Sequence, residues 1–299
     1  MSKILAKYRN GNYSVMLFDN GTKIRSNQLD NLTPEFAESI DIEISNKCDG
    51  GCKYCYMNCT EHGEHADLHN PVFDTLHKGT EIALNGNDLS HPDLEDFLIR
   101  MKEKGVICNL TINQKHLSKN MDKLKDWQDR KLIWGIGISL TDSTDKELPT
   151  NFHKLKNTVL HIIDGIFTKQ DMENLKDKKF TLLVLGYKIV GRGVTYYNEH
   201  KQEIEENIAY LRENLYQNKS WFNGIGFDTL ATQHLNLREQ VGEQNWALYH
   251  MGEEGEYTFF YNSVNKKFAV SSLEPEQFDE LRSVDEMFQF VRKKQKFAN

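Results

Sequence analysis

From residue 40 onward, short apolar runs alternate along the chain with amphipathic stretches of helical period. This alternation is typical of βα units, in which the strands form a mostly parallel sheet and the helices cover it. The sequence therefore predicts an α/β fold. The expected strands lie at residues 40–45, 81–85, 106–112, 132–139, 158–163, 180–187 and 223–228.

Two of the helical stretches are well marked. Residues 92–101 begin with Pro92, which suits the first turn of a helix, and Gly105 ends this helix before the next strand. Residues 198–217 form a longer and more charged stretch. Each has an apolar face, made of Leu94, Phe97, Leu98 and Met101 in the first and of Ile204, Ile208, Leu211 and Leu215 in the second.

The pattern changes towards both ends of the chain and predicts three segments. Residues 3–27 have β character with two Asn/Gly turns, which indicates a small N-terminal β-element over one end or edge of the core. Towards the C-terminus we expect a β-hairpin at 257–261 and 267–271 and a helix at 275–294, which together cover the central segment. The predicted segments are residues 1–37, 38–240 and 241–299.

Three cysteines, Cys48, Cys52 and Cys55, follow the first of these strands in a C-x3-C-x2-C spacing. A 4Fe-4S cluster is held by Cys thiolates and normally takes four, so a loop with three leaves one iron open to a small-molecule ligand. Gly50 and Gly51 allow backbone conformations closed to other residues, which lets Cys48 and Cys52 point at one cluster.

This spacing, with the aromatic Tyr54 before the last cysteine, resembles the signature of the radical S-adenosylmethionine (radical SAM) family. The resemblance implies a partial β/α barrel, one 4Fe-4S cluster on Cys48, Cys52 and Cys55, and S-adenosylmethionine as cofactor. In that family the open iron binds S-adenosylmethionine, and one electron cleaves it to methionine and a 5'-deoxyadenosyl radical that abstracts hydrogen from a substrate. The C-terminal segment has no cysteine, so no auxiliary cluster is expected.

A structural zinc site is the alternative for this loop. Cys59 follows closely, and four thiolates at Cys48, Cys52, Cys55 and Cys59 would complete a tetrahedral shell. The spacing allows either arrangement. We expect the open site, in which Cys59 is not a ligand.

Further residues at strand ends match the family in part. Gly86, Asn87 and Asp88 resemble its Gly-Gly-Glu-type motif, which receives the methionine amino group, although the same residue types also suit a plain turn. The resemblance assigns Ser139, after the fourth strand, to the ribose or carboxylate of S-adenosylmethionine. For Gly86, Asn87 and Asp88, the alternative of an ordinary turn stays open.

The fifth strand contains residues 161–168, which resemble the family's G-x-I-x-G-x-x-E element that packs against adenine. Ile163 and Gly165 match this element, whereas His161 and Thr168 depart from its first Gly and its Glu. Ile and Gly are also common at any buried strand end. Ile163 and Gly165 are therefore expected to bind the cofactor.

Five polar residues near other strand ends are candidates for the site. Lys188 is the predicted catalytic residue, as an anion or carboxylate contact at the cavity mouth; Arg192 has no preferred role. Asn113 and Gln114 suit substrate binding or helix capping equally. Asp228 either orients substrate or caps the next helix, and capping is the commoner use.

Two other features have simpler interpretations. His62, His65 and His69 have the spacing of one helical face, but histidines in a polar loop are usually solvated. Cys108 lies within the third strand and is expected to be a small core residue.

Composition limits the class of protein. The formal net charge of -7 makes nucleic acid an unlikely partner, and the basic run at residues 292–296 is read as the end of a helix. No apolar run approaches the roughly 20 residues of a membrane span. Clustered cysteines and the lack of a signal-like N-terminus predict a cytoplasmic protein.

The predicted function is that of a radical SAM enzyme acting on a peptide. The alternatives are a nucleoside or other small-metabolite substrate, a glycyl-radical activating enzyme, and a non-catalytic four-cysteine zinc or iron–sulfur module. Such an enzyme needs an electron donor of flavodoxin or ferredoxin type.

Overall fold

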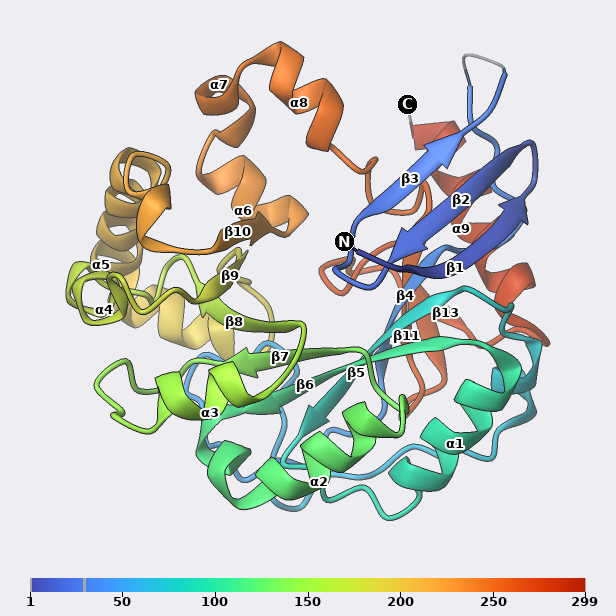
Figure 1. Cartoon of the computed structure of the whole chain (residues 1–299), viewed down its shortest axis with the longest axis horizontal. Coiled ribbons are helices and arrows are strands. Elements are labelled where there is room, and N and C mark those ends of the chain that lie inside the picture. The colour runs from blue at the N-terminus through green and yellow to red at the C-terminus, as the bar shows by residue number, and fades with distance from the viewer. Residues whose placement is uncertain (1, 29–30, 299) are drawn as a thin grey trace.

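The computed structural model describes residues 2–28 and 31–298, and these form a mixed α/β fold with two β-sheets (Figure 1). The smaller sheet is antiparallel and lies near the N-terminus, as predicted. Gly11, at φ +57°, forms the turn between its first two strands. The strands of this sheet are β1 (Ile4–Asn10), β2 (Tyr13–Phe18) and β3 (Lys23–Ser26).

The larger sheet has ten strands in the order β10-β9-β8-β7-β6-β5-β4-β11-β12-β13. All pairs from β10 to β11 are parallel, which confirms the prediction of a mostly parallel sheet. Every predicted strand is found to within a few residues. The parallel strands that follow one another in the chain are β4 (Ser39–Glu43), β5 (Glu81–Asn87), β6 (Ile107–Asn113), β7 (Gly135–Ser139), β8 (Thr158–Ile163), β9 (Thr181–Leu185) and β10 (Gly224–Phe227).

Helices connect these strands and lie outside the curve of the sheet (Figure 1). They are α1 (Leu94–Lys104), α2 (Leu117–Asp129), α3 (Leu148–Lys154), α4 (Lys169–Leu175) and α5 (Arg192–Asn214), followed after β10 by α6 (Thr229–His234), α7 (Leu237–Val241) and α8 (Glu243–Tyr249). Short 3-10 helices are η1 (Pro71–Thr75), η2 (Gln114–His116) and η3 (Lys219–Trp221). In α1 the predicted apolar face is buried, and Gly105 ends the helix in the left-handed conformation.

The predicted helix at 198–217 begins earlier than expected, at Arg192, and ends at Asn214. His200 interrupts it with a non-helical backbone (φ −125°, ψ 22°). Its first turn has no buried apolar stripe, so hydrophobic periodicity did not reveal this turn. The predicted stripe is otherwise present, with Ile204, Leu211 and Leu215 buried and Ile208 partly buried.

The C-terminal hairpin forms as β11 (Thr258–Asn262) and β12 (Lys267–Ala269), and β11 continues the large sheet beside β4. The helix predicted from residue 275 is wrong at its start. Phe278–Asp279 is strand β13, paired with β12, and helix α9 (Val284–Ala298) begins later. Phe278 packs against Phe268 and Phe290, with ring centroids 5.6 and 4.6 Å away, and these long-range contacts override its helical spacing.

The N-terminal sheet is anchored at the amino ends of the parallel strands. Glu38, which precedes β4, is completely buried and accepts hydrogen bonds from Tyr13 Oη at 2.6 Å and Arg25 Nε at 2.9 Å. Lys23 Nζ lies 2.7 Å from Glu81 Oε2 at the start of β5. This sheet therefore covers one end of the core, as expected. The division into three segments remains a prediction.

The main core fills the space between the large sheet and its helices. Trp127 of α2, Phe180 before β9 and Phe288 of α9 are among its largest fully buried side chains. Within residues 2–28 and 31–298, no helix combines the length and apolar character needed to cross a lipid bilayer.

Candidate functional site

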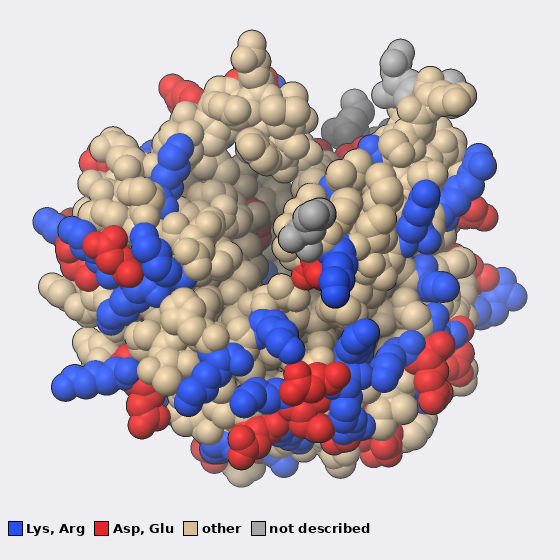
Figure 2. Space-filling view, viewed as in Figure 1, with Lys and Arg blue, Asp and Glu red and all other residues tan. Residues whose placement is uncertain are grey.

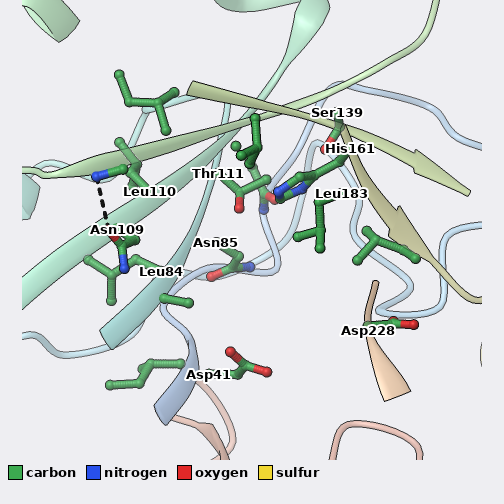
Figure 3. A pocket seen from close by; sticks show the side chains of 18 of the residues that line it. Asp41, Leu84, Asn85, Asn109, Leu110, Thr111, Ser139, His161, Leu183 and Asp228 are labelled. Atoms are coloured by element: carbon green, nitrogen blue, oxygen red, sulfur yellow. Dashed lines mark hydrogen bonds between the residues drawn. The ribbon is translucent and has the colours of Figure 1, made fainter. Parts of the chain in front are cut away.

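The strands β4 to β9 curve round a cavity of about 870 Å³, and side chains from all six line it. Figure 3 shows Asp41, Asn85, Thr111, Ser139 and His161 around this shared space. In Figure 2 the molecule is hollowed between the α6–α8 region and the N-terminal sheet. In sheets of this kind, ligands bind at the carboxyl ends of the strands.

The predicted cluster cysteines line the carboxyl end of this cavity. Cys48, Cys52 and Cys55 lie on the loop after β4, and Cys59 lines the cavity with them. A Cβ atom at Gly50 would lie 3.1 Å from Cys48 Sγ and 3.7 Å from Cys52 Sγ. The absence of a side chain at Gly50 therefore makes room for both sulfurs.

The donor chemistry of this loop fits an iron–sulfur cluster, because three thiols lie around one end of one cavity. Across the part of the chain that the structure describes, no three or more His, Cys, Asp or Glu side chains form a group positioned to hold a metal ion. The loop therefore offers ligands of the right chemical type, but these side chains do not form a closed coordination shell.

The four cysteines differ in their electrostatic environments. The neighbouring Cys59 thiol lowers the pKa of Cys55 to about 6, against the opposing effect of burial. The Cys55 thiol, together with burial, raises the pKa of Cys59 strongly. Burial raises the pKa values of Cys48 and Cys52. The Cys55 and Cys59 thiols therefore shift each other's pKa in opposite directions.

The start of helix α5 holds the cysteine loop, a role that the sequence did not indicate for Arg192. Its guanidinium donates to the carbonyl oxygens of Cys52 and Cys59, at 3.1 and 2.9 Å. Tyr54 also lines the cavity, and its ring meets that of Tyr196 in α5 edge to face, with centroids 5.6 Å apart. Burial raises the pKa of Tyr54 to about 12.

The end of β5 and the turn after it support the loop from the other side. Asn87 Nδ2 donates to the carbonyls of Ser45 and Lys47 at 3.1 and 3.2 Å, and Asn87 lines the cavity. Asp88 caps a turn by accepting from the Ser90 N–H at 3.0 Å and does not line the cavity. Asn87 therefore lies beside the site, whereas Asp88 has the turn role that its residue type also suggested.

Two of the predicted glycines are close to protein atoms and not to the cavity. A Cβ at Gly86 would lie 2.6 Å from the Thr111 carbonyl oxygen. One at Gly165 would lie 2.6 Å from Ile204 Cγ2 and 3.0 Å from Tyr187 Cβ. Both positions need glycine so that neighbouring elements can pack closely. The space saved at these glycines is filled by protein atoms and not by the cavity.

Two of the predicted site residues, Ser139 on β7 and Ile163 on the adjacent strand β8, line the cavity. Asn113 also lines it, and its side chain caps η2 by accepting from the Lys115 N–H at 3.0 Å. Gln114 is buried and bonds to the loop after β7, where its Oε1 accepts from the Thr141 N–H at 2.8 Å. Gln114 thus has a structural role.

Lys188 lines the cavity, and its surroundings are set by protein groups. Its Nζ donates to Ser272 Oγ at 2.8 Å and lies 4.2 Å from the centre of the Tyr56 ring. Burial is the largest single influence on its pKa and lowers it, but the charges of Tyr56, Asp228, Asp41 and Glu254 raise it, and the net shift is upward. Lys188 therefore remains a cation inside the cavity.

Three secondary predictions can be checked directly. Asp228 caps α6 by accepting from the Ala231 N–H at 2.7 Å, which confirms the capping role. Cys108 is buried in the core, and burial raises its pKa. The His62–His69 segment is not helical, so these histidines do not form one helical face; His65 Nδ1 lies 2.9 Å from Ser45 Oγ.

Two cavity residues were missed by the sequence analysis. His161 lies over Gly137 of the neighbouring strand, where an added Cβ would come within 2.3 Å of the ring. Burial lowers the pKa of His161 to about 4, so the imidazole is neutral. Asp41 lines the same space, where its side chain is exposed to the cavity. Strand alternation places both polar side chains inward and was the available signal.

Comparisons with known proteins find similar folds among solved structures. No protein-family model matches the chain, and no curated protein matches it. Among solved structures, Streptococcus suis SuiB bound to its precursor peptide SuiA has 12% identity and a TM-score of 0.52, covering 90% of this chain and 83% of that chain. SuiB solved by itself has 11% identity and a TM-score of 0.55, covering 96% and 89%. At these identities the similarity establishes the α/β fold.

Proposed function

We propose that this protein is a radical SAM enzyme that acts on a peptide. The observation that carries the proposal is the C-x3-C-x2-C loop, whose three thiols line one end of a large cavity at the carboxyl ends of parallel strands. The fold supports it, because a similar structure was solved with a precursor peptide bound. In this proposal strands β4 to β10 form a partial β/α barrel within residues 38–240.

Cys48, Cys52 and Cys55 would hold one 4Fe-4S cluster. When bound, such a cluster with an open iron supplies the electron that cleaves S-adenosylmethionine to a 5'-deoxyadenosyl radical. The chain's own part is to hold the thiolates, orient the cofactor and keep water out of the cavity. An electron donor of flavodoxin or ferredoxin type, and a cytoplasmic location, belong to the same proposal.

The cofactor-binding residues of this proposal are those that line the cavity. Tyr54, Asn87, Ser139 and Ile163 remain candidates for contact with S-adenosylmethionine. Gly86, Asp88 and Gly165 contribute through packing and turn formation. Because Lys188 is held as a cation, its proposed role is to attract the carboxylate of the cofactor or substrate.

The second candidate is a non-catalytic four-cysteine module, which the contact between Cys55 and Cys59 favours. Anaerobic reconstitution with iron and sulfide, followed by S-adenosylmethionine and dithionite, separates the two. The enzyme is expected to bind about four irons per chain and release 5'-deoxyadenosine. Tight zinc binding without 5'-deoxyadenosine would support the module instead.

A matched pair of variants makes this test specific. Cys48→Ala removes a proposed ligand and should abolish the 4Fe-4S absorption. Cys108→Ala removes a core thiol far from the loop in sequence and should keep both the absorption and 5'-deoxyadenosine formation. A full iron complement in Cys48→Ala would exclude Cys48 as a ligand.

A further inference from the structure

The first residue of helix α5 contacts both ends of the segment that contains the last two cluster cysteines. The Arg192 N–H donates to the Cys55 carbonyl at 3.2 Å and to Asn58 Oδ1 at 2.8 Å. Its Nε donates to the Cys52 carbonyl at 3.1 Å, and its Nη2 to the Cys59 carbonyl at 2.9 Å. One residue thus bridges positions 52 and 59 and satisfies a carbonyl between them.

The two glycines beside Arg192 allow this close approach. Gly191 has φ +59°, and a Cβ there would lie 2.3 Å from the Tyr56 carbonyl oxygen. A Cβ at Gly193 would lie 2.2 Å from the Lys188 carbonyl oxygen in the preceding turn, and 3.6 Å from the Tyr54 carbonyl oxygen. At Gly191 the helix start therefore packs backbone against backbone on the cysteine loop, and this packing sets where the guanidinium lies.

All four acceptors of Arg192 are neutral oxygens, so none of these contacts cancels its charge. A guanidinium offers several N–H groups in a rigid plane and can bridge two carbonyls at once, which a single ammonium does not do in the same geometry. Its planar fork also loses less conformational freedom than a flexible lysine for each hydrogen bond formed.

We propose that Arg192 is a positioning residue for the cysteine loop: its guanidinium bridges Cys52 and Cys59 and holds a positive charge at the loop. The inference deepens the proposed function and rests on it where the cluster is concerned. The hydrogen bonds from Arg192 to Cys52 and Cys59, called the tie below, are present in the metal-free chain. Arg192 acts through the loop and makes no contact with substrate in this role.

The tie is tested first in the metal-free protein. Cys52 and Cys55 are alkylated with N-ethylmaleimide, and the rates are followed by mass spectrometry of the loop peptides. Arg192→Lys keeps the positive charge but loses the planar fork that bridges both carbonyls, and it should raise these rates about tenfold, because hydrogen bonds from a charged donor are worth about that factor. Arg192→Gln also removes the charge that favours the reactive thiolate, so the rates in Arg192→Lys decide this part of the proposal.

Arg212 provides the matched control, because it lies on the same helix and donates through Nε and Nη2 to the His234 carbonyl at 2.9 and 2.6 Å. Arg212→Gln should leave the loop thiols at their normal rates. Equal rates in Arg192→Lys and in the Arg212→Gln control would overturn the proposal. Reaction of the buried Cys108 marks any variant that unfolds.

The charge is tested after reconstitution by spectroelectrochemical titration. Removing a cation near a cluster favours its oxidised state, so Arg192→Gln should shift the midpoint potential to more negative values, while Arg192→Lys should restore it. Iron release to a ferrous chelator should be faster in both variants than in Arg212→Gln. An unchanged potential in Arg192→Gln would contradict the electrostatic part.

If the unmodified chain assembles no cluster, the proposed function fails, whereas the alkylation result still decides whether Arg192 holds the loop.

Discussion

The Cys55 and Cys59 thiols act on each other, lowering the pKa of Cys55 and raising that of Cys59. Cys59 is also buried and lies 3.9 Å from Asn87 Nδ2. A thiol that lowers the pKa of a neighbouring ligand cysteine has a role without being a ligand itself. This is the residue at which the open cluster and the closed four-thiolate site differ most.

We expect Cys59→Ala to keep nearly all of its iron and its 5'-deoxyadenosine yield after reconstitution, because an open site needs only three thiolates. In a closed site the same change should remove much of the metal affinity, since structural sites depend on all four ligands. Iron analysis and chromatography of the nucleoside products provide the measurement. Loss of iron without S-adenosylmethionine cleavage by the unmodified chain would contradict the enzyme proposal.

His161 is a neutral imidazole inside the cavity, with a pKa lowered to about 4 from its ordinary value of 6.5. Between these values the unfolded chain binds a proton that the folded chain does not. The stability linked to His161 is therefore present above pH 6.5 and is lost as the pH falls towards 4.

His161→Asn should remove this part of the pH dependence in the metal-free protein. The shift corresponds to about 3 kcal/mol of unfolding free energy between the two pH limits. Denaturant unfolding at pH 4.5 and pH 7 should show a smaller difference in the variant than in the unmodified chain. The exposed His62 supplies the control, and His62→Asn should leave the difference unchanged. An identical difference in His161→Asn would mean that the imidazole titrates normally.

At the scale of elements, glycines set how closely strands and helices approach. Gly86 lies on β5 against β6, where an added Cβ would meet the Thr111 carbonyl oxygen at 2.6 Å and Leu110 Cδ1 at 2.8 Å. One of these contacts is backbone, which does not move away easily. Gly86 is thus needed for the pairing of β5 with β6, just before the segment that supports the cysteine loop.

Gly86→Ala should lower the unfolding free energy by about 2 kcal/mol, as overpacking of a close-packed interior commonly does. Gly224 is the control, because it lies on the edge strand β10 and a Cβ there would meet only Thr181 Cγ2, at 3.7 Å. Urea unfolding of Gly86→Ala and Gly224→Ala measures the contrast. Equal stability of the two variants would argue against tight packing at Gly86.

At the scale of the whole molecule, a buried charge network joins the two sheets. Glu38 is completely buried between Arg25, Lys23 and Tyr13 of the N-terminal sheet and the start of β4. Removing one charge from such a network leaves the others buried without full compensation. The N-terminal sheet depends on this network to stay in place over the end of the cavity that lies opposite the cysteine loop.

Glu38→Gln should cost about 3 to 5 kcal/mol of unfolding free energy, the usual effect of breaking a buried pair. The exposed Asp126 pairs with Arg130 Nη1 at 2.8 Å, so Asp126→Asn is a surface control that should cost less than about 1 kcal/mol. Calorimetric or urea unfolding measures both variants. A cost in Glu38→Gln as small as in the control would show that the network adds little stability.

The sequence by itself determined the order of the elements and the place of the cysteine loop. Strands β4 to β10 were found from local apolar runs, and Asp228 was recognised as a helix cap, because periodicity and capping depend on neighbouring residues. Cys48, Cys52 and Cys55 could be assigned to one site for the same reason, since they share one short loop.

Only the tertiary structure decided which residues meet across the fold. Arg192 binds the cysteine loop over 140 and 133 residues of sequence. Phe278 became a strand residue because of its partners in β12 and α9. Gly165 faces Tyr187 and Ile204, whereas its pattern suggested a cofactor. Packing between distant segments leaves no local period in the sequence, and it therefore becomes visible only when the chain is folded.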